Sequence, residues 1–348
     1  MLEQDQSLTV TDVHAIVGQV LQQVTHQVIG QERTAAMTLA AFLARGHVLL
    51  EDVPGLGKTL LARTFAALLG LKFRRLQCTP DLLPGDVTGG FVYAPISGGV
   101  EFRPGPVFAG LLLADEINRA TPKAQSALLE AMQERQVTVE NQTYLLPRPF
   151  LVIATSNPVE SEGTFALPEA QLDRFLVRLP MGFPTRDQEC SVIAARLADG
   201  DEPAPLRAVL DAPTLAAAQA AVTRVQVDPD VMTYCADVAG ATRQQPLLEV
   251  GASTRAAVAL ATMARAHAIV AGRGYVLPED VKAVAVPVLA HRLVLSAQGW
   301  ARRTSRADLV EALLGQVPTP PTRPQHWAAE ASVPHPQPHP HPQPAAAP

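Results

Sequence analysis

A glycine-rich turn in this chain carries the residue types that phosphate groups require. Residues 53–60 read VPGLGKTL. Glycines let successive backbone N–H groups wrap a phosphate, Lys58 supplies a neutralising charge, and the Thr59 hydroxyl is a suitable Mg²⁺ ligand. The residues expected to contact the bound phosphates or the rest of their ligand are Pro54, Gly55, Leu56, Gly57, Lys58, Thr59 and Leu60.

One position departs from the usual phosphate-loop pattern. Asp52 stands where GxxxxGK[ST] has its first glycine. A carboxylate that faced the phosphates would repel them, so we expect Asp52 to point away. The alternative for this segment is an ordinary glycine-rich turn between a strand and a helix.

Two adjacent carboxylates follow an apolar run. Residues 111–116 read LLLADE, so Asp115 and Glu116 end a predicted buried strand. Asp115 would hold Mg²⁺ through its water shell, and Glu116 would orient and deprotonate an attacking water. The alternative is that both residues cap the following helix.

A polar amide ends a third apolar run, because Asn157 follows LVIATS. Asn157 would position the same water from a strand adjoining the one that carries Glu116. As an isolated feature, it is equally well explained as a turn former before Pro158.

Two arginines outside the phosphate loop and the carboxylate pair are candidates to contact a phosphate. Arg255 is expected in the first turn of a helix, against the helix dipole, so an anion should compensate it, either a γ-phosphate or an acidic neighbour. Arg174 precedes a core strand and is the candidate to act on a neighbouring subunit's nucleotide. Its alternative is a salt bridge to Asp173 or Glu169. Arg119 and Arg178 are the backup candidates for the same role.

These residues need a parallel sheet to position them. Short apolar runs alternate with helical stretches up to Pro184, which predicts an α/β fold with a parallel sheet flanked by helices. The predicted strands are residues 47–50, 73–77, 111–114, 150–155 and 175–179. An amphipathic helix capped by Thr11 or Asp12 precedes them.

Beyond Pro184 the strand pattern stops, and an all-helical lid is expected. Its predicted helices are residues 186–198, 214–223, 229–240, 254–271 and 279–294. Eleven of the 31 prolines lie after Val317, where the sequence is too rich in Pro and His to build a core. The expected domains are residues 1–28, an N-terminal helix; 29–184, an α/β nucleotide-binding core; 185–316, the lid; and 317–348, a disordered tail.

Composition excludes several classes of protein. A 47% hydrophobic chain can bury a core, and a net charge of −5 over 348 residues offers no basic field for nucleic acid. The three cysteines form no CxxC pair and are expected to be small buried residues, while no apolar run is long enough to insert in a membrane. We therefore expect a cytoplasmic protein that does not bind nucleic acid.

Together these segments resemble the MoxR family of AAA+ ATPases over about residues 10–316. The resemblance rests on the phosphate loop, on TPDLLP (79–84), and above all on ADEINRA (114–120). The stretches QSALLEAMQE (125–134), ATSNP (154–158) and LPEAQLDRF (167–175) extend it. Thr254 departs from the proline often found before the last arginine in the family.

The resemblance implies a P-loop AAA+ core with a five-stranded sheet, and a homo-oligomer, a hexameric ring, that binds ATP and Mg²⁺ between subunits. Lys58 and Thr59 resemble the Walker A pair, and Asp115 and Glu116 the Walker B pair. Asn157 is similar to sensor 1, Arg174 to the arginine finger, and Arg255 to sensor 2. Residues 89–103 and 136–146 resemble hairpin insertions that either contact a client or are purely structural.

The expected function is therefore that of an ATPase that remodels or activates a client protein, including by inserting a metal cofactor into it. The resemblance implies a von Willebrand factor A domain protein as partner. The alternatives are an ATPase subunit like that of magnesium chelatase, a nucleic-acid motor, which the acidic balance disfavours, and a nucleotide-gated scaffold with negligible turnover.

Overall fold

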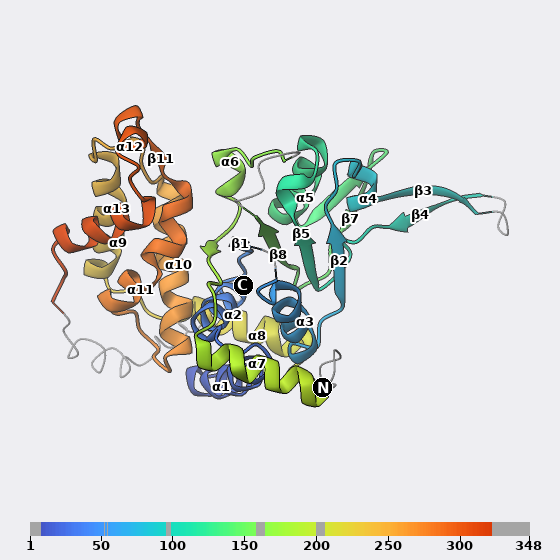
Figure 1. Ribbon diagram of the computed structural model, residues 1–348, viewed down its shortest axis with the longest axis horizontal. Helices are drawn as coiled ribbons and strands as arrows, with labels where there is room; N and C mark the ends of the chain where they lie inside the picture. The colour runs from blue at the N-terminus through green and yellow to red at the C-terminus, as the bar shows by residue number, and fades with distance from the viewer. Residues whose placement is uncertain are drawn as a thin grey trace, which may run out of the picture.

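The computed structural model describes residues 8–51, 53, 55–94, 99–157, 164–199 and 206–321. An α/β part carries two projecting hairpins, and a helical part packs beside it (Figure 1). Among the helices that the structure describes, none combines the length and the apolar character that crossing a membrane requires.

A single parallel sheet of five strands forms the centre of the α/β part, in the order β2-β5-β8-β1-β9. The strands are β1 (Val48–Glu51), β2 (Phe73–Gln77), β5 (Leu111–Asp115), β8 (Leu151–Ser156) and β9 (Val177–Leu179). Each coincides with a predicted strand to within two residues at either end. The predicted α/β fold with a five-stranded parallel sheet is confirmed.

Alternate residues of the strands pack into two different cores. Leu111 and Leu113 of β5 join a cluster with the first three helices, whereas Leu112 and Ala114 join a cluster with α5. These helices are α1 (Val10–Gln27), α2 (Glu32–Leu43), α3 (Lys58–Leu68) and α5 (Pro122–Glu134). Because side chains alternate along a strand, an unbroken apolar run supplies both faces of the sheet.

The start of α1 differs from the prediction. Thr9, not Thr11 or Asp12, is the N-cap: its hydroxyl accepts from the Asp12 backbone N–H at 3.2 Å. The Asp12 carboxylate in turn accepts from the Thr9 backbone N–H at 2.9 Å. This reciprocal arrangement satisfies two N–H groups at once, which a cap within the first turn could not do.

Two further helices, α7 (Arg186–Asp199) and α8 (Ala212–Thr223), lie below the sheet with the first three helices (Figure 1). The helical part at the side of the sheet contains α9 (Pro229–Arg243), α10 (Thr254–Val270), α11 (Pro278–Leu289), α12 (Ala297–Ala301) and α13 (Arg306–Gln316). The expectation that strands end at Pro184 is wrong, because β10 (Leu248–Val250) and β11 (Val294–Leu295) form a small antiparallel sheet. Strands of two and three residues are too short to show an alternating pattern. One expected buried cysteine, Cys190 on α7, is exposed, whereas Cys78 and Cys235 are buried.

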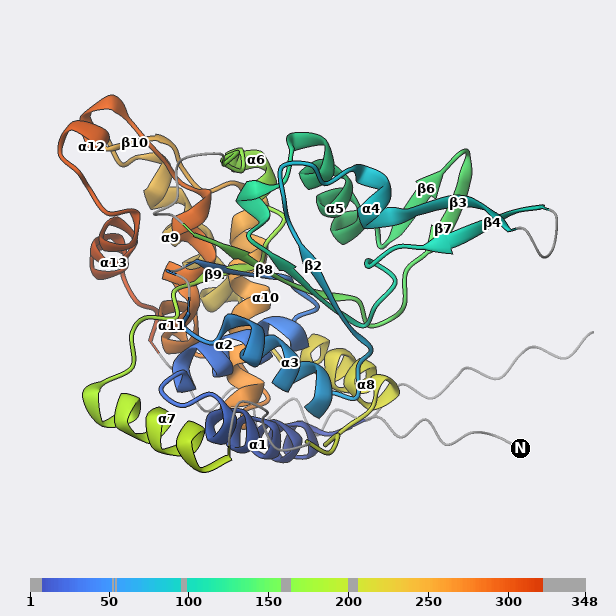
Figure 2. The same ribbon diagram turned by 45° about the vertical axis from the view of Figure 1, so that its right-hand side comes forward.

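Two antiparallel hairpins project from the sheet on the side of α4 (Pro84–Thr88) and α5 (Figure 2). They are β3 (Gly89–Ala94) with β4 (Gly99–Pro104), and β6 (Gln136–Val139) with β7 (Gln142–Leu145). The rings of Phe102 and Tyr144 stack at 3.9 Å between centroids, so one aromatic contact joins the two hairpins.

A buried histidine ties the start of β1 to its neighbours. His47 Nδ1 accepts from the Val152 backbone N–H at 3.1 Å, so Nε2 carries the proton that it donates to the Met132 carbonyl at 3.2 Å. Burial lowers the pKa of His47 to about 4, against a smaller opposing effect of the Met132 hydrogen bond. The folded protein therefore holds this ring neutral.

Acid should destabilise the fold through His47. Between pH 6.5 and about 4 the unfolded chain takes up a proton that folded His47 excludes, so this stability is complete above pH 6.5 and is lost as the pH falls. The full loss is about 3 kcal/mol. Urea unfolding at pH 7 and pH 4.5 should show a smaller pH effect in His47→Gln than in the control His26→Gln. Equal pH effects in both variants would contradict the assignment.

Candidate functional site

The phosphate loop has the backbone that its glycines predict. Gly55 has φ +88° and Gly57 φ +84°, and a side chain at either position would meet open space or only a distant contact. Glycine is therefore required by conformation and not by crowding. Gly57 caps α3, so Lys58, Thr59 and Leu60 form the first turn of that helix, where backbone N–H groups lack helical partners.

Two residues of the expected loop, Asp52 and Pro54, lie outside the described residues. The expected orientation of Asp52 therefore stays a prediction. Of the other expected contact residues, Gly55 is exposed, and Leu56 and Leu60 are half-buried and pack against the core that α1 and α3 share.

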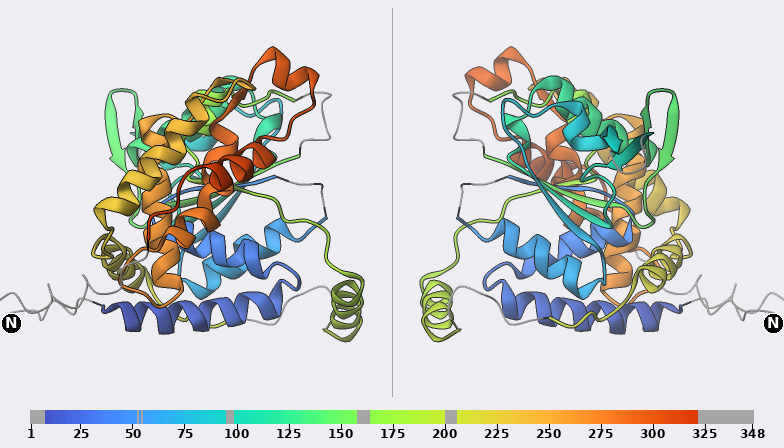
Figure 3. Two further views of the ribbon diagram at one scale, coloured as in Figure 1. Left: turned by 90° about the vertical axis from the view of Figure 1, so that its left-hand side faces the viewer. Right: turned by 90° about the vertical axis from the view of Figure 1, so that its right-hand side faces the viewer.

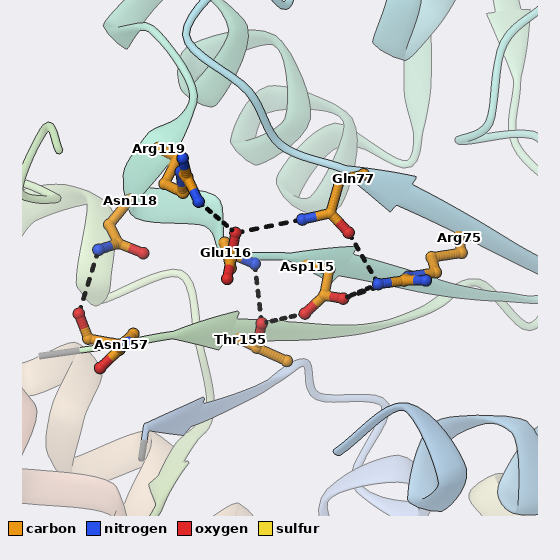
Figure 4. Close-up of polar contacts among 8 residues, drawn as sticks. All are labelled: Arg75, Gln77, Asp115, Glu116, Asn118, Arg119, Thr155 and Asn157. Carbon is orange, nitrogen blue, oxygen red and sulfur yellow. Dashed lines mark hydrogen bonds and ion pairs between the residues drawn. The ribbon is translucent and has the colours of Figure 1, made fainter. Parts of the chain in front are cut away.

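A threonine that sequence reasoning missed joins the two carboxylate positions. Thr155 of β8 donates from its hydroxyl to Asp115 Oδ1 at 2.7 Å and accepts from the Glu116 backbone N–H at 2.8 Å (Figure 4). Glu116 has φ +56°, a left-handed conformation that costs a non-glycine residue energy and that these bonds help to hold. The sequence signal that could have identified Thr155 was the position of this residue within the ATSN motif, residues 154–157.

The edge strand β2 contributes two further polar side chains that were missed. Arg75 contacts Asp115 Oδ2 through Nε at 3.1 Å and Nη2 at 2.5 Å, and Gln77 donates to Glu116 Oε2 at 3.2 Å (Figure 4). The two residues are spaced by two and so share one face of β2. The sequence signal that could have identified them was two polar residues, two positions apart, in a strand that was expected to lie in the core.

The carboxylates make this edge of the sheet electronegative. Cys78, next after β2, donates its backbone N–H to the Asp115 carbonyl at 2.9 Å. Burial, and then the charges of Asp115 and Glu116, raise the pKa of the Cys78 thiol to about 12. Such a field suits a site for a divalent cation.

The two backup arginines are engaged within the chain. Arg119 pairs with Glu116 at 3.2 Å, and Arg178 of β9 pairs with Glu51 at the end of β1. Burial lowers the pKa of Arg178. In this arrangement, each guanidinium group is paired with a carboxylate of the same chain.

Strand register brings the phosphate loop and the carboxylates to one edge. Glu51 of β1 pairs with Ser156, and Ala114 of β5 pairs with Ala154, so β1, β5 and β8 end at one level. Lys58 follows β1 and Glu116 follows β5, and β8 lies between these two strands. This order sets β1 and β5 about 10 Å apart, two strand spacings.

The intervening strand β8 carries Asn157 at its carboxyl end, between the phosphate loop and the carboxylates. Asn157 is buried, and its carbonyl accepts from Asn118 Nδ2 at 3.3 Å. As expected, it follows a strand that directly adjoins the strand ending in Asp115.

Arg174 and Arg255 lie together at the other edge of the sheet. Leu176 donates its backbone N–H to the carbonyl of His47, before β1, so Arg174 lies at the amino ends of the strands. Arg255, in the first turn of α10 as expected, contacts Asp173 Oδ2 at 3.2 Å. The acidic neighbour that we considered for Arg255 is the contact that forms here.

The turn between α1 and α2 also lies beside the phosphate loop. A side chain at Gly57 would come within 3.9 Å of Val28, the C-cap residue of α1, and Gly30 has φ +80°. An apolar side chain beside a phosphate-binding turn is suited to the base of a nucleotide.

The described residues fit a magnesium nucleotide. The hard oxygen donors that Mg²⁺ prefers come from Thr59 and Asp115, and the turn at Gly55 and Gly57 exposes backbone N–H groups before a helix N-terminus. Lys58 adds the cation that a triphosphate requires. This combination defines a P-loop nucleotide-binding protein.

Comparison with known proteins gives the class. Residues 47–177 match the ATPase family associated with various cellular activities (AAA), and residues 240–313 match the AAA lid domain. A crystal structure of a protein from Cytophaga hutchinsonii, named as a candidate ATPase, superposes with a TM-score of 0.83 at 38% identity, covering 89% of this chain and 96% of that one. The fold and the phosphate loop are therefore those of an AAA+ ATPase.

Curated relatives give the family. The chain is 41% identical over 302 residues to chaperone MoxR1 of Mycobacterium tuberculosis, covering 84% of this chain and 79% of that one. It is 33% identical to protein MoxR of Methylorubrum extorquens, covering 86% and 93%, and 42% identical to the uncharacterized protein YeaC of Bacillus subtilis, covering 90% and 97%. The chain belongs to the MoxR family of AAA+ ATPases.

Arg75 should compete with Mg²⁺ for Asp115. Arg75→Ala removes the cation that now pairs with the carboxylate, so magnesium–ADP should bind about three- to tenfold more tightly, a modest gain because the Arg75 side chain is 43% exposed. Arg74→Ala, the same charge change on the opposite face of β2, is the control. Calorimetric titration measures both. Weaker binding by Arg75→Ala alone would mean that Arg75 contacts the ligand.

Proposed function

We propose that this protein hydrolyses ATP as a ring of identical subunits, with each active site shared between two neighbours. One observation carries the proposal. The phosphate loop and the Asp115–Glu116 pair lie at the carboxyl ends of the strands, whereas Arg174 and Arg255 lie at the amino ends. An arginine at one edge reaches a phosphate at the opposite edge only in another copy of the chain.

In this proposal the residues at the carboxyl edge perform separate tasks. Lys58 and the N–H groups of the loop bind the phosphates, and Thr59 and Asp115 hold Mg²⁺, which neutralises phosphate charge. Glu116 accepts a proton from the attacking water, and Asn157 orients that water from the strand end between Lys58 and Glu116.

Two side chains occupy one oxygen of Glu116. Arg119 pairs with Glu116 Oε2, and Gln77 donates to the same oxygen. Turnover therefore requires Glu116 to exchange these partners for water.

Ring formation follows from the split between the two edges. A head-to-tail contact sets the carboxyl edge of one subunit against the amino edge of the next, and repeated contacts of this kind close into a ring. Among the described residues, the Arg174 side chain has no ion-pair partner. We propose a hexamer by resemblance to the family.

The two hairpins are the surface that we propose for binding a client protein. A relative is named a chaperone, and the joined hairpins expose apolar side chains at Tyr93, Val100 and Leu145. We propose that these hairpins contact a client protein and that a von Willebrand factor A domain protein assists, metal-cofactor insertion being one form of such activation.

A second candidate function is a nucleotide-gated scaffold with negligible turnover. The observation that favours it is the pairing of both site carboxylates with arginines, Asp115 with Arg75 and Glu116 with Arg119. The two candidates differ in whether Glu116 matters for turnover.

Glu116→Gln should separate the two candidates. Loss of the general base should slow single-turnover hydrolysis by about 10²- to 10⁴-fold, while the affinity for magnesium–ATP stays near that of the wild type. Rapid-quench measurement of ADP formation tests the rate. If wild type and variant are equally slow, the protein is a scaffold.

Mixing two inactive variants tests the shared site. Lys58→Ala lacks the phosphate ligand but retains Arg174, and Arg174→Ala has the opposite defect. A 1:1 mixture should recover up to about one quarter of wild-type steady-state turnover, because one interface in four then joins two intact halves. Each variant alone is the control. A mixture as inactive as its components would refute a site shared between subunits.

A further inference from the structure

A buried arginine of the helical part holds the segment that carries Arg174. Arg292 ends the short 3₁₀ helix η2 (Ala290–Arg292) that follows α11, and its side chain is only 5% exposed. Its Nε donates to Asp173 Oδ1 at 2.7 Å.

The rest of the guanidinium is bonded to backbone carbonyls. Nη2 donates to the carbonyls of Phe175 at 2.7 Å and Asp173 at 3.3 Å, and Nη1 donates to those of Leu176 at 3.1 Å and Val288. One side chain from the helical part therefore fixes the residues on both sides of Arg174.

Another contact comes from the residue next to Arg292. His291 lies beneath the same segment, and its Nε2 donates to the carbonyl of Phe175 at 3.1 Å. Burial lowers the pKa of His291 well below its ordinary value, so the ring is neutral. The two bonds from η2 leave the Phe175 carbonyl little freedom to move.

Asp173 divides its two carboxylate oxygens between two arginines. Oδ1 accepts from buried Arg292, and Oδ2 accepts from Arg255, whose side chain is 68% exposed. Burial lowers the pKa of Arg292, and the bond to Asp173 opposes that effect, so the pair compensates an otherwise costly buried cation.

This division has a consequence for Arg255. When Arg255 leaves Asp173 to bind a phosphate, the Asp173 carboxylate stays neutralised by Arg292. The departure therefore leaves no unpaired charge in a half-buried position, and the exposed arginine can exchange one anion for another at low cost.

We propose that Arg292 is a positioning residue, which holds Asp173 and the Arg174 segment so that Arg174 and Arg255 reach a neighbouring subunit's nucleotide phosphates as one unit. This inference rests on the proposed shared site. Arg292 itself touches no nucleotide. Its fork of donors sets where the two arginines lie, and its attachment to α11 makes their placement depend on the helical part.

Arg292→Lys tests the proposal, because it retains the charge and loses the fork. The variant alone should lose about 10- to 100-fold in kcat, as expected for misplaced catalytic groups, with KM for ATP changed less than about twofold. Binding of magnesium–ADP should be unchanged, since its own phosphate loop is intact. The matched control is Arg302→Lys, an exposed lid arginine, which should behave as wild type.

Mixed rings distinguish positioning from folding. An Arg292→Lys subunit placed beside a Lys58→Ala subunit meets an intact Arg174 and Arg255, so the mixture should recover about as much turnover as the mixture of Arg174→Ala with Lys58→Ala. If turnover recovers when Lys58→Ala is mixed with Arg174→Ala but not when it is mixed with Arg292→Lys, the positioning role of Arg292 is wrong and the shared site still stands. Failure of both would overturn the shared site.

Asp173→Asn provides the result if Arg292→Lys does not fold. Asparagine removes the negative charge that pairs with both Arg292 and Arg255, so buried Arg292 loses its counter-ion and no longer fixes the Arg174 segment. The same loss of kcat and the same recovery in mixed rings are expected. Unchanged turnover in a folded Asp173→Asn protein would contradict the proposal.

Discussion

Parallel pairing of β8 with both β1 and β5 is the constraint on which the site depends. Register places Glu51 level with Ser156 and Ala114 level with Ala154, so the turn that follows β1 and the carboxylates that end β5 occupy one edge. Thr155 of β8 then bonds both Asp115 and the backbone of Glu116. A slip of one residue would turn Thr155 to the opposite face and break this connection.

The strands that define the edge were predictable because they are buried on both faces, which leaves continuous apolar runs such as residues 111–114. The candidate site residues at their ends could be named because polar groups follow those runs abruptly. Their partners could not. Arg75 and Gln77 contact the carboxylates only after β2 pairs with β5, a relation between distant segments that local periodicity does not contain.

Features of the helical part escaped prediction for a similar reason. The sheet of β10 and β11 depends on residues about 45 positions apart, and the contact between Arg255 and Asp173 joins residues 82 positions apart. Sequence reasoning found a cation that needed an anion but could not choose between a phosphate and a carboxylate. Figure 3 shows the helical part packed along one side of the sheet.

The stack of Phe102 on Tyr144 has a mechanical consequence. The β3–β4 hairpin is rooted through α4 in the end of β2, and the β6–β7 hairpin is rooted through α5 in the end of β5. A force on the tip of either hairpin is therefore transmitted to the ends of both β2 and β5. Gln77 ends β2 and Glu116 follows β5, and the two side chains are hydrogen-bonded, so a force applied far from the sheet would act as shear on that hydrogen bond.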